Sequence, residues 1–243
     1  MSGLERLLLA RPCTTQRHHS NGENMTDDVI ELGAILYPGF EMLDLFGPLE
    51  MFSLLGPERV KINMIAQNKG PVTAAMGTDI QHGPKTLADF SFEDAPPLDI
   101  LLLPGGFGTL PELGNETLLT FLAQSAARAR ITASVCTGSA LLAKAGVLDG
   151  HRATTNKQLF ALAVAQSDKV DWIEQARWVD DGNVVTASGV SAGMDMSLGI
   201  IQRLFGDEAA RTVMTAAEYS WHEDPGVDPF AAELNKAAGV LGL

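Results

Sequence analysis

The sequence predicts a single α/β domain with a mainly parallel sheet, and two observations support that prediction. From Val29 onward, short apolar runs rich in β-branched residues alternate with segments of helical period, an order typical of strands joined by crossover helices. Hydrophobic residues make up 46% of the 243 residues, which is enough to form a large core. Because no internal repeat or interdomain linker interrupts this region, we expect one domain.

The expected elements follow one another along the chain. Four buried strands are predicted at residues 30–37, 60–67, 99–104 and 131–136. Helices are predicted at residues 43–55, 116–129, 137–145 and 158–165, with two more at 193–205 and 207–221. Asp181-Gly182 lies between two strand-like runs, which indicates an antiparallel hairpin.

The two ends of the chain differ from its middle. Residues 1–27 are polar, rich in turn-forming residues and without period, which is typical of a disordered leader; Met25 is an alternative first residue. We expect the α/β domain to span residues 28–230 and a C-terminal tail to span residues 231–243. No apolar run approaches the roughly 20 residues that cross a bilayer, so no membrane partner is expected.

The net charge limits the binding partners that we expect, and the cysteine content limits the cellular compartment. The formal net charge is -13, and no cluster of lysines or arginines forms a basic stripe, so the chain is not expected to bind nucleic acid. Its two cysteines, Cys13 and Cys136, do not form the pattern of a disulfide framework, which favours a reducing cytoplasmic location.

Cys136 marks the strongest candidate site. It lies where a predicted strand turns into a predicted helix, in the segment ASVCTGSA, and small neighbours permit a tight turn that exposes the central side chain, as in serine hydrolases. In open sheets, ligands bind at the carboxyl ends of the strands. The first N–H groups of the helix would lower the pKa of the thiol, so we expect a thiolate; the alternative is an inert buried thiol.

Five motifs together resemble the PfpI/ThiJ superfamily, relatives of the class I glutamine amidotransferases. They are FEMLDLFGPLEMF, ILLLPGGFG, SVCTGSALLAKAGVLDGHRATT, GNVVTASGVSAGMD and EYSW, and they are especially similar to the isonitrile hydratase branch. The resemblance covers residues 29 to about 230. It implies a flavodoxin-like sheet flanked by helices, a small-molecule substrate and a homodimer.

The same resemblance implies a mechanism. Cys136 would attack the terminal carbon of an isonitrile to form a thioimidate, and Asp44, which matches the aspartate before the GP of the first helix, would act as general acid and base. Water would then release an N-substituted formamide. Backbone N–H groups of Gly106 and Thr137 are candidate donors for developing charge. From the residues alone, Asp44 could equally cap its helix, and a thiolate beside a neutral carboxylic acid is the expected state of the pair.

Other positions leave alternatives open. Asn156 stands after RATT, where many relatives carry a histidine, and it cannot act as a base; it would bind main chain or, with Gly105, line the pocket. His222 would either fold over a pocket, of its own chain or of a partner, or complement the end of the last helix. Glu218 and His222 are four residues apart, but no further ligand set completes a metal motif. Because the glycines of PGGFG do not match GxGxxG, neither a metal nor a cofactor is expected.

Two other kinds of function stay open at this point, and a third is disfavoured. Cys136 could serve a redox or electrophile sensor or a ligand-binding module without turnover. Glyoxalase-like or deglycase-like carbonyl chemistry is a further alternative, although it lacks the usual histidine. Some related sequences carry a helix-turn-helix domain and regulate transcription; we expect no such domain before Leu243.

Overall fold

The computed structural model describes residues 29–237 and 239, and its centre is a seven-stranded sheet. The strands run in the order β10-β11-β7-β6-β1-β2-β5, and every neighbouring pair is parallel except β10 with β11. Their bounds are β1 (Ile30–Leu36), β2 (Val60–Ala66), β5 (Phe90–Ser91), β6 (Ile100–Leu103), β7 (Ile131–Val135), β10 (Trp178–Asp181) and β11 (Val184–Ala187). The predicted α/β fold with a mainly parallel sheet is confirmed.

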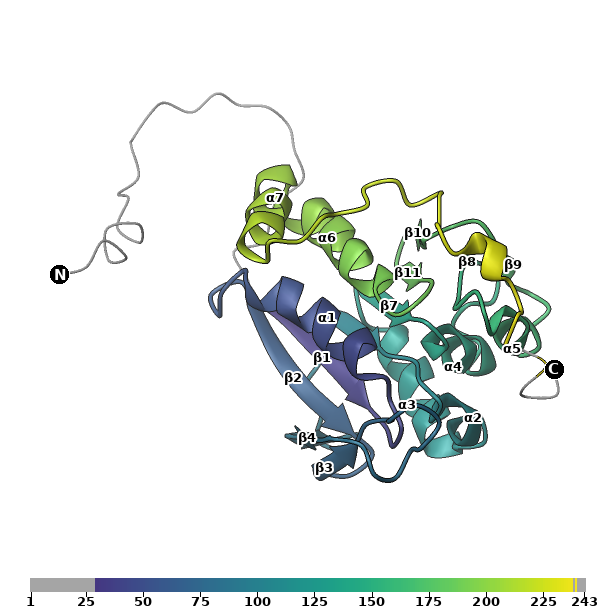
Figure 1. Cartoon of the computed structure of the whole chain (residues 1–243). Coiled ribbons are helices and arrows are strands. Elements are labelled where there is room, and N and C mark those ends of the chain that lie inside the picture. The colour runs from purple at the N-terminus through teal and green to yellow at the C-terminus, as the bar shows by residue number, and fades with distance from the viewer. Residues whose placement is uncertain (1–28, 238, 240–243) are drawn as a thin grey trace, which may run out of the picture.

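Helices flank this sheet (Figure 1). They are α1 (Met42–Ser53), α2 (Thr109–Glu112), α3 (Glu116–Ala126), α4 (Gly138–Lys144), α5 (Phe160–Val164), α6 (Ala192–Phe205) and α7 (Asp207–Ala216), with a 3-10 turn η1 at Ala231–Glu233. Helix α1 packs against α6, which also packs against α7 and β11, whereas α3 and α4 pack against each other. Two small ribbons lie outside the main sheet: β3 (Gly70–Thr73) pairs with β4 (Lys85–Ala88), and β8 (Arg152–Ala153) pairs with β9 (Asp171–Trp172).

The middle of the sheet forms the core. All residues of β6 and β7 are buried, as expected for parallel strands covered by helices on both faces. Continuous apolar runs such as ILLL can therefore be recognised as strands from sequence alone, and predicted and observed ends of most elements differ by at most three residues. The short elements β3, β4, β5, α2, β8 and β9 were not predicted, because they carry no clear apolar period.

The predicted hairpin is present, with its turn one residue further along. Asp181 pairs with Val184, so the two turn residues are Gly182 and Asn183 rather than Asp181 and Gly182. Gly182 has φ +76°, the left-handed conformation that such turns require. Strand β11 also pairs in parallel with β7, so the hairpin extends the main sheet instead of forming a separate ribbon.

The last predicted helix is too long by five residues. Helix α7 ends at Ala216, because Glu218 takes the left-handed conformation, with φ +48°. The N–H of Tyr219 then donates to the carbonyl of Met214 at 3.0 Å, a pattern that closes the end of a helix. The usual glycine signal for this ending is missing, since a glutamate occupies the position.

The segment after α7 crosses α6 and reaches α5 (yellow in Figure 1). At its far end, Asn235 N–H donates to the carbonyl of Lys157 at 2.8 Å, and Ala237 N–H donates to that of Gln158 at 3.2 Å. Residues 231–237 therefore contact the domain, while the predicted boundary at residue 230 stays a prediction. The predicted leader, with Cys13, lies outside the described residues. None of the described helices is long and apolar enough to span a bilayer.

Candidate active site

Cys136 lies in a strained turn between β7 and α4. Its φ is +57°, a conformation that costs a non-glycine residue about 1–3 kcal/mol. The turn is tight because β6 ends directly against the start of α4. A Cβ at Gly138 would lie 2.7 Å from the carbonyl oxygens of Leu103 and Pro104, so only glycine fits there. The structure thus places Cys136 at the carboxyl end of the sheet, as the sequence predicts.

Several hydrogen bonds hold this turn in place. The Cys136 N–H donates to the carbonyl of Ala187 at 3.1 Å. Its own carbonyl accepts from the hydroxyls of Thr155 at 3.0 Å and Ser139 at 3.1 Å. The sulfur accepts from Nδ2 of Asn156 at 3.2 Å. Only 6% of the residue is exposed, so the fold shields the side chain from most of the solvent.

Asp44 lies in the first turn of α1 and is completely buried. Its Oδ2 accepts the N–H of Gly105 at 2.8 Å, whereas its Oδ1 has no hydrogen-bond partner among the described residues. The carboxyl group therefore ties α1 to the PGG loop instead of capping its own helix. Gly105 serves this contact, and a Cβ on it would lie 2.5 Å from the backbone nitrogen of Thr137.

Burial determines the protonation of this pair. It raises the pKa of Asp44 well above its usual range, and the N–H of Gly105 only partly opposes that effect. Burial also raises the pKa of the Cys136 thiol, and the carboxyl of Asp44 adds to the rise. The direction for Asp44 favours the expected neutral carboxylic acid, whereas the direction for the thiol disfavours the expected thiolate. The N–H of Thr137 and the Asn156 amide do lower the thiol pKa, yet burial outweighs them.

Gly106, one of the two expected backbone donors, is engaged within the loop in this structure. Its N–H donates to Oγ1 of Thr137 at 3.0 Å, and that oxygen lies 2.9 Å from Oγ1 of Thr109. The Tyr37 hydroxyl, 3.1 Å from Thr109 Oγ1, donates to the carbonyl of Pro104. A buried chain of hydroxyls thus fixes the loop. Of the two predicted backbone donors, the N–H of Thr137 is the one directed at the sulfur.

Asn156 combines the two roles that the sequence leaves open. Its Nδ2 contacts the Cys136 sulfur, and its Oδ1 accepts the N–H of Leu159 at 3.1 Å. Within its own chain, His222 neither covers the pocket nor complements the end of the last helix. Its side chain is exposed, and α7 ends six residues before it. Its N–H donates to Asp195 at 2.9 Å. Asp195 itself is buried in the first turn of α6, where its Oδ2 pairs with Nε of Arg177 at 2.7 Å.

A pocket of about 300 Å³ opens onto Cys136. Besides Cys136, Gly106, Thr137 and Asn156, it is lined by Glu41, Phe107, Gln158, Leu159, Val190 and Ala237. The sequence interpretation missed Glu41, although it stands three residues before Asp44 in the same motif. Ala237 belongs to the segment that follows α7, and no pattern in the sequence indicates its place in the wall of this pocket.

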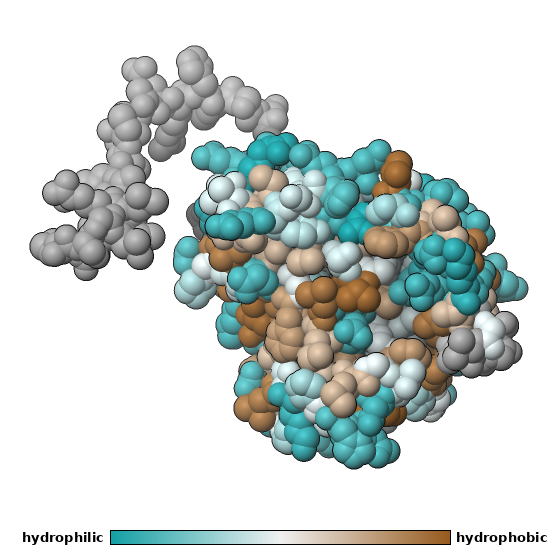
Figure 2. Space-filling view, viewed as in Figure 1, coloured by the Kyte–Doolittle hydropathy of each residue, from teal (hydrophilic) through white to brown (hydrophobic). Residues whose placement is uncertain are grey.

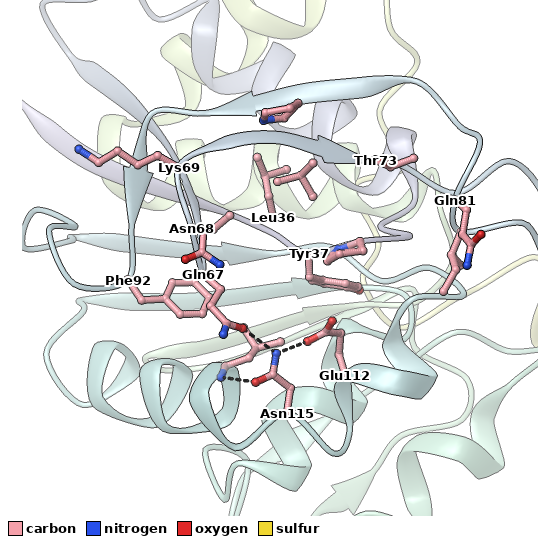
Figure 3. A pocket seen from close by; sticks show the side chains of 16 residues that line it. Leu36, Tyr37, Gln67, Asn68, Lys69, Thr73, Gln81, Phe92, Glu112 and Asn115 are labelled. Carbon is pink, nitrogen blue, oxygen red and sulfur yellow. Dashed lines mark hydrogen bonds between the residues drawn. The ribbon is translucent and has the colours of Figure 1, made fainter.

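A larger pocket, of about 560 Å³, lies at the carboxyl ends of β1 and β2 (Figure 3). Its wall includes linked polar side chains, since Nδ2 of Asn115 donates to Gln67 at 3.0 Å and to Glu112 at 2.6 Å. Neither Cys136 nor Asp44 lines it. The smaller pocket is the candidate active site because it alone of these two contains the cysteine. The described residues hold no cluster of three or more His, Cys, Asp or Glu side chains suited to a metal ion.

Comparisons with known proteins give consistent matches. The model of the DJ-1/PfpI family matches residues 34–203. The chain is 36% identical over 196 residues to an isonitrile hydratase of Pseudomonas putida, covering 79% of each protein. It is 30% identical over 192 residues to the HTH-type transcriptional regulator GbdR of Pseudomonas aeruginosa, and the match spans 75% of this chain but about half, 48%, of that regulator.

Solved structures match as well. A THiJ/PfpI family protein from Pseudomonas syringae superposes with a TM-score of 0.70 at 29% identity, covering 93% of this chain and 98% of that one. DJ-1beta of Drosophila melanogaster superposes with a TM-score of 0.67 at 21% identity, covering 80% of this chain and all of that one. The second likeness concerns the fold alone.

Proposed function

The chain belongs to the DJ-1/PfpI family, as its motifs predict, and on that premise we propose that it is a cysteine-dependent hydratase that converts an isonitrile into an N-substituted formamide. The observation that carries the proposal is the pairing of Cys136, on a strained turn at a pocket, with a completely buried Asp44 whose pKa is raised by that burial. Its relative in Pseudomonas putida, named isonitrile hydratase, supports the same chemistry.

In the first step, sulfur bonds to the terminal carbon of the isonitrile. That carbon gains a proton from the carboxylic acid of Asp44, and the thiol proton of Cys136 passes to the carboxylate, so the product is a thioimidate and Asp44 is again protonated. Oδ1 of Asp44 suits this exchange because Oδ2 is occupied by the N–H of Gly105. No preformed thiolate is required, which agrees with the raised pKa of the thiol.

In the second step, water adds to the thioimidate carbon. Asp44 takes a proton from the water while its own proton goes to the nitrogen, which gives a tetrahedral adduct. The C–S bond then breaks, the hydroxyl proton returns to sulfur, and the N-substituted formamide leaves. One water is consumed in each cycle, and both Cys136 and Asp44 end in their starting protonation states.

The alternatives have less support. Glyoxalase-like chemistry removes a proton from carbon, and Asn156, which donates to the sulfur, offers no base for it. Reversible redox sensing favours an exposed thiol of low pKa, whereas Cys136 is buried and its thiol pKa is raised. Because the mechanism needs a reduced thiol, we place the enzyme in the cytoplasm.

Formamide production from cyclohexyl isocyanide tests the proposal. We expect turnover by the wild type, none by Cys136→Ala, and a loss of about a hundredfold or more in kcat/KM for Asp44→Asn, the usual scale for a positioned acid–base group. Ser125→Ala, on α3, is a control that should keep full activity. Wild-type activity in Cys136→Ala or Asp44→Asn would refute the mechanism.

A further inference from the structure

Glu41 places a carboxylate at the pocket of Cys136. It is the N-cap residue of α1, but its side chain makes no capping hydrogen bond. Its backbone is held, since the Glu41 N–H donates to the carbonyl of Gly105 at 2.7 Å. No hydrogen bond or ion pair engages its carboxylate within the described part of the chain. Glu41 lines the pocket, and no described partner neutralises its carboxylate.

No positive charge of the described pocket wall offsets Glu41. The other described residues that line the pocket are neutral or apolar, with Phe107, Gln158 and Val190 among them. Lys157 is next to Asn156 in sequence, but its ammonium group is directed elsewhere. It donates to the carbonyl of Ala176 at 2.7 Å and to Oγ1 of Thr154 at 2.8 Å.

The charge of Glu41 also reaches the reacting groups. It contributes to the raised pKa of Asp44 and to the raised pKa of the Cys136 thiol. A substrate carboxylate in the same pocket would meet the same negative field. Since like charges across a small, partly buried space repel each other more strongly than in water, discrimination by repulsion is effective there.

We propose that Glu41 determines the charge selectivity of this site, so that isonitriles bearing a carboxylate are rejected and neutral or cationic isonitriles are accepted. The proposal rests on the proposed function for its choice of substrate. The repulsion between Glu41 and a substrate carboxylate, partly screened by salt, is expected to lower kcat/KM for the anionic substrate by about tenfold. Glu41 acts here on specificity and takes no part in the proton transfers.

Methyl isocyanoacetate and isocyanoacetate form a matched substrate pair that differs in charge. We expect the wild type to favour the ester, and Glu41→Gln to reduce the ester-to-carboxylate ratio of kcat/KM by about tenfold. Comparing ratios cancels the intrinsic reactivity of each compound. Glu50→Gln makes the same change on an exposed residue of the same helix, and it should leave the ratio at the wild-type value.

A second measurement does not depend on turnover. The rates at which iodoacetamide and iodoacetate alkylate Cys136, followed by mass spectrometry of its peptide, compare a neutral and an anionic reagent. Glu41→Gln should reduce the iodoacetamide-to-iodoacetate ratio by about tenfold. Any change in thiol pKa affects both reagents and cancels.

The outcomes separate the two proposals. If both enzymes hydrate the ester and the substrate ratio is the same in each, charge selection by Glu41 is overturned while the hydratase stands. If neither isonitrile is turned over, the proposed function fails, and the alkylation ratio decides: a tenfold shift supports charge selection, and an equal ratio overturns it.

Discussion

Asp44 is the residue at which function and stability oppose each other. Its carboxyl group is completely buried, and one of its oxygens has no partner among the described residues. Such a group costs free energy in the folded state when it is ionised. The same burial raises the pKa of the carboxyl group and so favours the neutral carboxylic acid that the proposed hydration requires.

The pH dependence of stability should reveal this cost. Because the pKa of Asp44 is raised in the folded state, the unfolded chain releases its proton first as pH rises above about 4. The folded state then loses stability until its own pKa is passed. Asp44→Asn has no titrating group at this position and does not lose this stability. The free energy of unfolding in urea of Asp44→Asn minus that of wild type should therefore increase from pH 4 to pH 8. A difference that stays constant with pH would contradict the raised pKa.

Asn156 offers a second test at the level of one side chain. Asn156→Ala removes a donor to the Cys136 sulfur and the acceptor for the Leu159 N–H. We expect the pKa of the thiol to rise further, so that alkylation of Cys136 at fixed pH slows. The free energy of unfolding should fall by about 1 kcal/mol. Asn68→Ala, at an exposed position, should change neither the alkylation rate nor the free energy of unfolding. Equal effects in both variants would contradict the two hydrogen bonds assigned to Asn156.

At the scale of elements, the start of α4 must lie directly against the end of β6. Gly138→Ala would push a Cβ to 2.7 Å from two carbonyl oxygens, so we expect the free energy of unfolding to fall by about 1–3 kcal/mol. Gly199→Ala is the matched control inside α6, where the new Cβ would meet only ordinary contacts at 3.5 Å or more. That variant should gain about 0.5–1 kcal/mol. Equal effects in urea unfolding would show that the close contact is absent.

The elements that could be predicted from sequence are those whose residues carry a strong pattern. Strand β6 is a continuous apolar run, β7 is a short run that begins and ends with β-branched apolar residues, and the corner at Cys136 follows from small residues between a strand and a helix. The end of α7 could not be predicted, because Glu218 rather than glycine takes the left-handed conformation. The sequence also could not reveal the thiol pKa. It depends on burial and on Asp44, which the fold brings to Cys136 from a distant helix.

At the scale of the whole molecule, one apolar face is exposed. Figure 2 shows brown, hydrophobic surface over the region that α1 occupies in Figure 1. On that helix, Leu43 is 41% exposed and Phe46 is 44% exposed, whereas its residues Leu45 and Phe52 are fully buried. Apolar side chains grouped on a surface helix are typical of interfaces.

We therefore propose that α1 forms the interface of a symmetric homodimer, the commonest form of soluble oligomer. Sedimentation velocity should give about twice the chain mass of 25.9 kDa, and Phe46→Asp should sediment as the single chain. The same substitution at Leu87, which is 60% exposed on β4, is expected to leave the dimer intact. A wild-type monomer would contradict this assembly.

The covalent intermediate provides the most direct test of the account as a whole. Time-resolved electrospray mass spectrometry of the enzyme mixed with cyclohexyl isocyanide should detect the chain with one isonitrile added, located on the Cys136 peptide and absent from Cys136→Ala. The adduct should appear before formamide accumulates and disappear as the substrate is consumed. Formamide formed at the wild-type rate by Cys136→Ala, with no adduct on the wild type, would contradict catalysis by this cysteine.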